Sequence, residues 1–285
     1  MSSADGAGTA RRAGVLGSPV AHSLSPALHR AGYAATGLTH WRYDAIDCDA
    51  RALPELVADA GPEWAGFSVT MPGKAAAAAV ADERSPRVVA LGVANTLVRR
   101  SGGWFAENTD VDGILGALRA AGTDAPRSAL LLGGGGTAAA AVGALVEMGA
   151  RRVVVAGRRT QSTAAVVELG ARVGVAVTAI GWTRDELADA AASADLVVST
   201  VPAGAAEPFA GVLSAVPVLF DVVYHPWPTP LAAAGTPGRV TVTGLDLLLH
   251  QAFRQFELFT GIPAPVAAMR DGLRLAAATE LPLPV

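Results

Sequence analysis

The chain has very little cysteine, few aromatic side chains and few charges. One cysteine, Cys48, stands among 285 residues, which excludes a disulfide within the chain and is typical of a reducing compartment. Cys48 lies between two aspartates that disfavour a thiolate, and we expect no redox role for it. Charged residues make up 16% of the sequence, the net charge is −3 and there is no basic tract, which argues against nucleic acid or an anionic membrane as a partner.

Long hydrophobic runs are also missing. Glycine, proline or charge interrupts every apolar stretch before it is long enough to cross a bilayer. Residues 1–11 are small and polar, without the apolar segment of a secretion signal, and we expect them to be disordered. The five histidines lack the spacing of metal ligands, so we expect no metal. These absences predict a cytoplasmic protein.

Glycine, in contrast, is concentrated in one stretch. Leu130–Leu132 predicts the end of a buried strand, and the alanine-rich run after the glycines predicts a helix through Met148. Gly133-x-Gly135-x-x-Ala138 fits the dinucleotide fingerprint, in which backbone N–H groups at a helix N-terminus face a phosphate. Four consecutive glycines can also form a flexible loop, but the strand before, the helix after and a second strand at 152–156 favour nucleotide binding.

The end of that second strand bears on which nucleotide is bound. NAD-binding proteins carry an acidic residue about 20 residues after the glycines, bonded to the ribose 2′-hydroxyl. Here the strand runs into Gly157-Arg158-Arg159-Thr160, with no acid and two guanidinium groups. Arginine forks hold a 2′-phosphate, so the sequence favours NADP over NAD. The alternative interpretation is a solvated surface turn.

Strands and helices alternate through the rest of the chain, and 51% of its residues are hydrophobic, enough for a sizeable core. The expected strands are 13–17, 41–46, 66–71, 92–98, 152–156, 173–178, 196–202, 218–224 and 239–243. One helix is expected to begin at Ser25, and further helices are expected at 53–60, 75–81, 114–120, 183–192 and 246–260.

This alternation predicts an α/β protein of two domains. A polar turn at 122–127 separates a substrate-binding catalytic domain, 12–121, from a doubly wound Rossmann domain that binds the nucleotide, 122–245. Residues 246–285 are expected to form C-terminal helices that pack back on the first domain.

Several polar side chains in the first domain have both a structural and a functional interpretation. Ser25 is placed to N-cap a helix with Pro26 at its first position, whereas Ser23 lies in a loop after a strand, where ligands bind. Lys74 stands at the start of a helix, where the dipole disfavours a cation, so it is either indifferent surface or a general acid/base.

Two further side chains are equally ambiguous. Asn95 is a polar residue inside an apolar run, and its amide is expected to bond either the backbone or a ligand. Thr109 or Asp110 can N-cap the helix that follows, but an aspartate in a cleft can also orient a lysine and a substrate hydroxyl.

Taken together, the motifs resemble the shikimate dehydrogenase family over Ala13 to about Leu275. Each block is common by itself, but their order and spacing are specific. The blocks are Ser23-x-Ser25-Pro26, Ser68-Val69-Thr70-Met71-Pro72-Gly73-Lys74, Ala94-Asn95-Thr96, Asn108-Thr109-Asp110-x-x-Gly113, Gly133-x-Gly135-Gly136-x-x-x-Ala140, Asp221-x-x-Tyr224-x-Pro226-x-x-Thr229-Pro230-Leu231 and Gly244-x-x-x-Leu248-x-x-Gln251.

The resemblance implies reversible NADP-dependent oxidation of the C3 hydroxyl of shikimate to 3-dehydroshikimate, a step in chorismate and aromatic amino acid biosynthesis. It implies that Lys74 is the general acid/base and that Asp110 is its partner. It assigns the substrate carboxylate to Ser23 and Ser25. It assigns the other polar groups of the substrate to Thr70, Asn95, Tyr224 and Gln251. The implied cofactor residues are Gly133, Gly134, Gly135, Gly136 and Thr137 for the diphosphate, Arg158 and Arg159 for the 2′-phosphate, and Thr200, Val222 and Gly244 for the rest of NADP, the last two at the nicotinamide.

The sequence departs from the family pattern at Ser68, where Asn is usual, and we take that position as structural support. A quinate/shikimate dehydrogenase that uses NAD is expected to show an acid after Ala156, and none is present. An aminoshikimate-type paralogue would keep the same catalytic pair. A non-catalytic NADP-binding paralogue is expected to lack Lys74 or Asp110, and both are present. A monomer and a homodimer both remain open.

Overall fold

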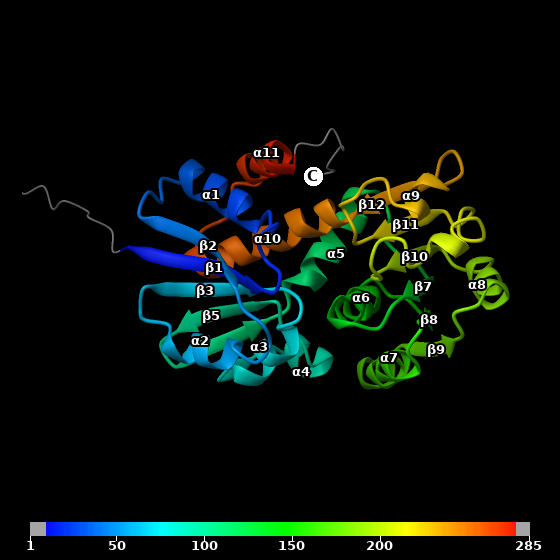
Figure 1. The fold of residues 1–285 in the computed structure, drawn as a ribbon, viewed down its shortest axis with the longest axis horizontal. Helices are drawn as coiled ribbons and strands as arrows, with labels where there is room; N and C mark the ends of the chain where they lie inside the picture. The colour runs from blue at the N-terminus through cyan, green and yellow to red at the C-terminus, as the bar shows by residue number, and fades with distance from the viewer. Residues whose placement is uncertain (1–9, 278–285) are drawn as a thin grey trace, which may run out of the picture. The chain divides into compact units, whose positions relative to one another are not determined.

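The computed structural model describes residues 10–277, which group into two compact units. The first unit consists of 10–85, 94–107 and 252–277, and the second of 86–93 and 108–251 (Figure 1). The expected boundary at residue 121 therefore differs from the grouping by contacts, which assigns the segment from residue 108 to the second unit. The disorder expected for residues 1–11 lies outside the described residues, except that Arg11 begins the first strand.

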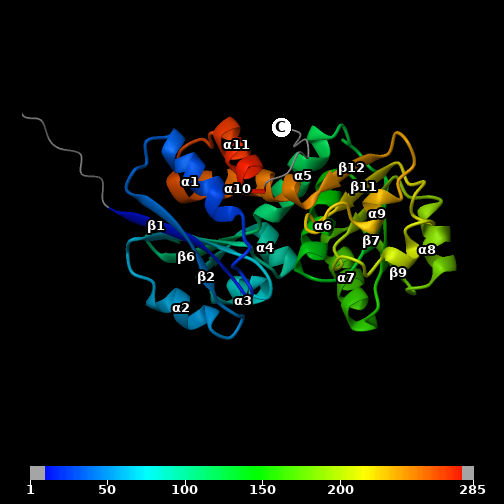
Figure 2. The same ribbon diagram turned by 45° about the horizontal axis from the view of Figure 1, so that its top comes forward.

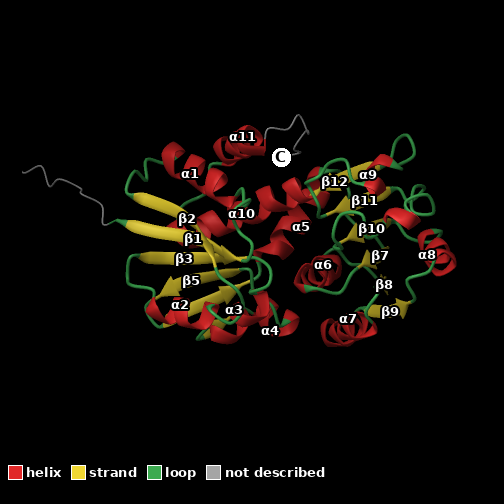
Figure 3. Ribbon diagram, viewed as in Figure 1, coloured by secondary structure: helices red, strands yellow, loops and turns green. Residues whose placement is uncertain are grey.

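The first unit contains a mixed six-stranded sheet in the order β2-β1-β3-β5-β6-β4, of which Figure 3 labels the first four strands. The pairs β1–β2, β1–β3 and β4–β6 are parallel, whereas β3–β5 and β5–β6 are antiparallel. Every residue of β3 is buried, which is typical of a central strand covered on both faces. The strands are β1 Arg11–Gly17, β2 Trp41–Asp47, β3 Trp64–Val69, β4 Glu83–Arg84, β5 Thr96–Arg100 and β6 Gly103–Glu107.

Helices α1 and α11 pack closely against each other in this unit, and Figures 1 and 2 both show them side by side. A Cβ atom on Gly272 would lie 2.6 Å from the Cβ of Ala31, so glycine permits this approach. Residues 252–277 thus belong to the first unit, whereas the expectation placed all of 246–285 there. The helices here are α1 Ser25–Ala35, α2 Leu53–Asp59, α3 Lys74–Val80, the second half of α10 (Gly244–Thr260) and α11 Val266–Ala277.

The second unit is a fully parallel sheet in the order β12-β11-β10-β7-β8-β9. This is the strand order of the doubly wound dinucleotide fold, and the predicted fold class is confirmed. Its strands are β7 Ser128–Leu132, β8 Arg152–Ala156, β9 Ala176–Ile180, β10 Leu196–Ser199, β11 Val218–Asp221 and β12 Val240–Thr243. Its helices are α4 Pro86–Leu91, α5 Thr109–Ala120, α6 Gly136–Glu147, α7 Thr160–Val173, α8 Arg184–Ala191, the short 3-10 helix Glu207–Phe209, α9 Pro230–Ala233 and the first half of α10.

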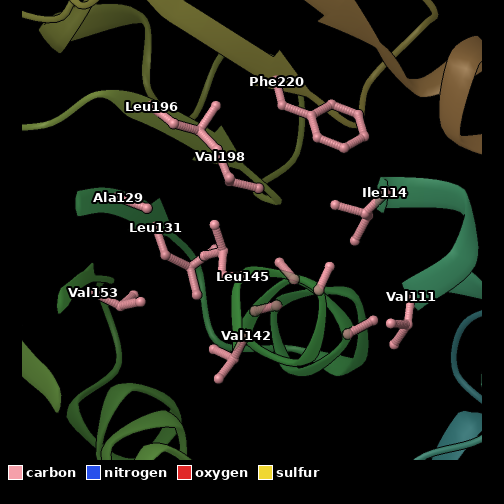
Figure 4. Close-up of a cluster of buried hydrophobic side chains, with 14 of the residues drawn as sticks. Val111, Ile114, Ala129, Leu131, Val142, Leu145, Val153, Leu196, Val198 and Phe220 are labelled. Carbon is pink, nitrogen blue, oxygen red and sulfur yellow. The ribbon is translucent and has the colours of Figure 1, made fainter. Parts of the chain in front are cut away.

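Two hydrophobic clusters cover the two faces of this sheet. One joins alternate strand residues to α5, α6 and α7, and Figure 4 shows Leu131 and Val198 of the sheet facing Leu145 of α6. The other joins the intervening residues, such as Leu130 and Val197, to α8 and α9. The alternation of side chains along each strand therefore supplies both cores. None of the helices described in residues 10–277 is long and apolar enough to cross a membrane.

The expected helix starts were wrong at two functional segments. Leu24, not Ser25, occupies the N-cap position of α1, and Asn108, not Thr109 or Asp110, occupies that of α5. Neither cap residue makes a side-chain capping bond. Ser25 and Asp110 instead lie buried inside the first helical turn.

His29 lies at the centre of the first unit, fully buried and stacked on Tyr43 with ring centroids 4.2 Å apart. Burial lowers the pKa of His29 to about 3. The histidine is therefore neutral in the folded protein at pH values where it is charged in the unfolded chain.

We predict that His29 makes the protein sensitive to acid. Between pH 6.5 and about 3 the unfolded chain binds the extra proton, so the free energy of unfolding falls by up to about 1.4 kcal/mol per pH unit as the pH drops. Urea unfolding from pH 7 to pH 4 should show this slope, and His29→Phe should reduce it. Replacement of the exposed His40 by Asn is the control, and an equal slope in all three proteins would contradict the assignment.

Candidate active site

The glycine stretch forms a tight turn between β7 and α6. Gly133 has φ +106°, and its N–H donates to the carbonyl of Ala156 at 2.8 Å. A Cβ atom on Gly133 would lie 2.5 Å from Thr200 Oγ1, and one on Gly134 would lie 2.5 Å from the carbonyl oxygen of Ser162. Both positions therefore exclude a side chain, which argues against an unstructured glycine loop.

This turn lies where a parallel sheet of this order binds nucleotides. Strands β7 and β10 are neighbours although two other strands separate them in sequence, so the connections diverge there and leave a crevice at the carboxyl ends. Thr200 follows β10 and donates from Oγ1 to the carbonyl of Leu132 at 2.9 Å. Gly136 and Thr137 form the first turn of α6, whose N-terminus favours a phosphate.

Arg158 and Arg159 follow β8 at the same edge of this sheet, and both are exposed. Arg159 occupies the N-cap position of α7 through its backbone. Helix α7 was missing from the expected elements, and it ends at Gly174, whose φ is +80°. The expected strand at 173–178 therefore begins only at Ala176.

A second group of predicted cofactor residues meets at the start of α10. A Cβ atom on Gly244 would lie 2.0 Å from the carbonyl oxygen of Val222 and 3.0 Å from Cδ1 of Tyr224. Val222, Tyr224 and Gly244 thus lie together, and only glycine fits at the third position. Burial raises the pKa of the Tyr224 phenol, which keeps it a neutral hydrogen-bonding group.

Asp221 holds the loop that carries these residues. Its Oδ2 accepts from Thr229 Oγ1 at 2.7 Å and its Oδ1 accepts from the Val223 N–H at 3.3 Å. Burial raises the pKa of Asp221, and these bonds, with one from Ser199, oppose the shift. The bond across residues 221 to 229 closes the proline-rich loop on itself.

Asp110 and Gln251 belong to two helices of the second unit that approach closely. A Cβ atom on Gly113 in α5 would lie 2.8 Å from Gln251 Cβ in α10. Thr109 Oγ1 lies 3.5 Å from Gln251 Oε1, and Gln251 Nε2 donates to the carbonyl of Leu248 at 2.9 Å. Asp110 is 6% exposed in the first turn of α5.

Helix α10 begins with a reciprocal capping arrangement. The Asp246 carboxylate accepts from both the N–H and the hydroxyl of Thr243, at 2.7 and 2.8 Å. Thr243 Oγ1 in turn accepts from the Leu245 and Asp246 N–H groups. Such a box sets where a helix starts, and here it sets the position of Gln251 along α10.

Thr70, Lys74 and Asn95 are tied together in the first unit by their backbones. The Thr70 N–H donates to the carbonyl of Leu16 at 2.9 Å, next to the end of β1. The Asn95 carbonyl accepts from the Val69 N–H at 2.7 Å. The Lys74 carbonyl accepts from the Ala94 N–H at 2.9 Å. These bonds fix the start of α3, where Lys74 is the only lysine of the whole chain.

Ser23 and Ser25 follow β1 in the same unit. The Ser25 N–H lies 3.4 Å from Ser23 Oγ, and Ser25 is 5% exposed. Burial raises the pKa of Tyr43, and hydrogen bonds from Ser68 and Ser25 act in the opposite direction.

The predicted site residues are thus distributed over both units. The first unit brings together Ser23, Ser25, Thr70, Lys74 and Asn95. The second unit carries Asp110, Tyr224 and Gln251 with all the predicted cofactor residues. Within residues 10–277 no group of three histidine, cysteine or acidic side chains is placed to hold a metal ion. The first unit thus offers one lysine for proton transfer, and the second unit has the dinucleotide fold.

Two buried side chains near these residues were not predicted. Gln255 is 1% exposed and bonds Ser68, Thr96 and the Asn95 backbone. The sequence did contain a signal for Gln255, because it lies one helical turn after Gln251 in α10. A buried amide at that position needs a hydrogen-bond partner. Ser68 was taken only as support.

We predict that Gly133→Ala weakens dinucleotide binding by at least about tenfold, because the new methyl group displaces Thr200 or the loop. Gly149→Ala is the matched control, since Gly149 also has a positive φ, +81°, but nothing lies near its missing Cβ. Both variants should lose stability to urea by about 1–2 kcal/mol. Equal dinucleotide affinity in both, measured by fluorescence titration, would contradict the role of Gly133.

Comparison with known proteins agrees with this geometry. The family model of the shikimate dehydrogenase substrate binding domain matches residues 15–97, and that of the shikimate 5'-dehydrogenase C-terminal domain matches residues 244–274. A shikimate dehydrogenase (NADP(+)) of Methylobacterium radiotolerans is 40% identical over 274 residues, which are 89% of this chain and 92% of the relative.

Solved structures give the same result. The crystal structure of Mycobacterium tuberculosis shikimate dehydrogenase is 52% identical with a TM-score of 0.88, over 93% of this chain and 99% of the other. A quinate dehydrogenase from Corynebacterium glutamicum in complex with NAD is 30% identical with a TM-score of 0.81, over 92% and 98% of the two chains. Likeness of this extent over nearly all of both chains shows that the protein belongs to the shikimate dehydrogenase family.

Proposed function

We propose that this protein catalyses the reversible NADP-dependent reduction of 3-dehydroshikimate to shikimate, in the biosynthesis of chorismate and the aromatic amino acids. The observation that carries the proposal is the 40% identity, over most of both chains, to a shikimate dehydrogenase (NADP(+)).

In the oxidation direction the C3 hydroxyl of shikimate loses a proton and its carbon loses a hydride, which leaves the carbonyl of 3-dehydroshikimate. NADP⁺ accepts the hydride when it is bound. Lys74 accepts the hydroxyl proton as general base and returns it as general acid in the reduction. Asp110 orients the ammonium that results.

The nucleotide loop fits this cofactor. Gly133 and Gly134 leave no space for a Cβ atom, so their backbone can approach a diphosphate, and the first turn of α6 faces it with N–H groups. Arg158 and Arg159 supply the positive charge for a 2′-phosphate. Thr200, Val222 and Gly244 complete the site, with the last two at the nicotinamide.

The polar side chains of both units bind the substrate. Ser23 and Ser25 hold its carboxylate by hydroxyl hydrogen bonds. The remaining oxygen atoms are bound by Thr70, Asn95, Tyr224 and Gln251.

The main alternative is oxidation of quinate with NAD. The Corynebacterium glutamicum relative has the same fold, so the fold does not separate the two activities. The residues after β8 favour NADP, because two arginines and no acid follow Ala156. An amino-substituted shikimate would be served by the same catalytic pair.

The proposal includes a cytoplasmic enzyme that acts on small molecules as a monomer or homodimer. The single cysteine, Cys48, is a free buried thiol, as expected in a reducing compartment. Sedimentation of the purified protein decides between the two oligomeric states.

We predict that the purified protein reduces NADP⁺ with shikimate and that Lys74→Met lowers kcat by about 10²–10⁴-fold while dinucleotide affinity stays within twofold. Asp110→Asn should lower kcat in the same direction. The assay is nicotinamide absorbance with shikimate and with quinate, each with NADP⁺ and with NAD⁺. Turnover of quinate with NAD⁺ alone would overturn the proposal, as would full activity in Lys74→Met.

The single lysine permits a check that needs no variant. An amine-specific reagent can modify only Lys74 and the α-amino group. The fraction of activity lost should equal the fraction of Lys74 modified. Shikimate together with NADP⁺ should slow the modification and the loss of activity. Modification of Lys74 without loss of activity would exclude it as the acid/base.

We predict that Arg158→Gln and Arg159→Gln raise KM for NADP⁺, at least about tenfold for the one that contacts the 2′-phosphate, and leave KM for NAD⁺ unchanged. The substitution removes a bidentate bond between the guanidinium and the 2′-phosphate, which NADP⁺ carries and NAD⁺ lacks. Arg151→Gln is the control, because Arg151 is equally exposed but lies at the opposite end of β8. Equal effects on both cofactors would contradict 2′-phosphate recognition.

A further inference from the structure

A chain of buried hydrogen bonds runs through the first unit and reaches Asn95. Tyr43 OH and Ser68 Oγ are 2.6 Å apart, and Ser68 Oγ donates to Gln255 Oε1 at 2.7 Å. On the other side, Gln255 Nε2 donates to Thr96 Oγ1 at 3.0 Å. All four side chains are at most 4% exposed, so water does not replace their partners.

The orientation of the Gln255 amide is fixed by a backbone group. Nε2 also lies 3.3 Å from the carbonyl oxygen of Asn95, which can only accept. Its other end, Oε1, must then accept, so the Ser68 proton points to Gln255. Because the Ser68 hydroxyl has one proton, Tyr43 must donate to Ser68.

This fixed amide determines the proton on Thr96. Since Thr96 Oγ1 accepts from Gln255, its own proton is directed elsewhere, and Oγ1 donates to Asn95 Oδ1 at 2.9 Å. Without Gln255, Thr96 could instead accept from the Asn95 NH₂ group, with the asparagine amide turned over. The direction of every bond in the chain therefore follows from one carbonyl group.

We propose that Gln255 is a positioning residue that acts through Thr96 to hold the Asn95 amide in one orientation, so that its NH₂ end serves as the donor to a substrate hydroxyl oxygen. The inference rests on the proposed function, in which Asn95 binds the substrate. The substrate atom that faces the Asn95 NH₂ group must therefore be an oxygen that can accept a hydrogen bond.

The sharpest variant is Thr96→Val, which keeps the shape of the side chain and removes only the hydroxyl. We expect it to raise KM for shikimate about tenfold, the effect of one hydrogen bond, with KM for NADP⁺ and kcat within about threefold. Thr96→Ser keeps the hydroxyl and should restore KM to within about twofold of the wild type. Thr260→Val is the matched control, because that hydroxyl donates to the Phe256 carbonyl and accepts from the Ile262 N–H, and neither partner belongs to the hydrogen-bond chain.

A double-mutant cycle separates positioning from general support. Gln255→Leu should raise KM for shikimate in the wild-type background and should have no further effect on KM in Asn95→Ala, where there is no amide to orient. A merely structural role of Gln255 would instead change KM by the same factor in both backgrounds. Urea unfolding identifies any variant that fails to fold. If Gln255→Leu fails to fold, the KM of Thr96→Val for shikimate tests the inference instead.

The outcomes for the inference and for the function are distinct. Turnover of shikimate by the wild type, with an unchanged KM in Thr96→Val or equal factors in the cycle, overturns the role of Gln255 and leaves the function standing. A wild type that binds NADP⁺ but does not oxidise shikimate overturns the function and, with it, the role of Asn95.

Discussion

The requirement that buried polar groups be paired controls how this protein places its functional side chains. Ser68 and Gln255 lie inside the first unit and bond each other there. Asp221 and Asp246 lie inside the second unit. Asp221 bonds Thr229 and so closes a loop, and Asp246 bonds Thr243 at the start of α10. Because an unpaired buried group costs about 1–3 kcal/mol, each bond also fixes an orientation. The proposed substrate-binding groups thus inherit their geometry from the core.

Close backbone approach is the second constraint, and it acts mainly where the nucleotide is proposed to bind. Gly133, Gly134 and Gly244 each face another atom within 2.5 Å of where a Cβ would be, so none tolerates a side chain. At Gly133 the contact comes from Thr200, which directly follows a strand that is distant in sequence but adjacent in the sheet. The glycine fingerprint therefore reflects the strand order as well as phosphate binding.

Long, regular elements were predictable because their signals are local. The strand at 152–156 was placed exactly, and α6 ends one residue from its expected end at Met148. The errors lie at helix starts and short elements. Ser25 and Asp110 were expected to cap helices, but caps depend on where a helix begins, and tertiary contacts moved that point by one or two residues. Helix α7 was missed, although Gly174 marks its end.

The sequence by itself determined the fold class and the nucleotide loop, because hydrophobic periodicity and glycine spacing are read along the chain. It also indicated the family, through the resemblance of its ordered motif blocks. Only the tertiary structure decided that Asp110 and Gln251 share one unit while Lys74 and Asn95 share the other. It alone connected Gln255 to Ser68, 187 residues away, and to Asn95, 160 residues away. Such partners leave no local pattern, because their distance along the chain is unrelated to their distance in space.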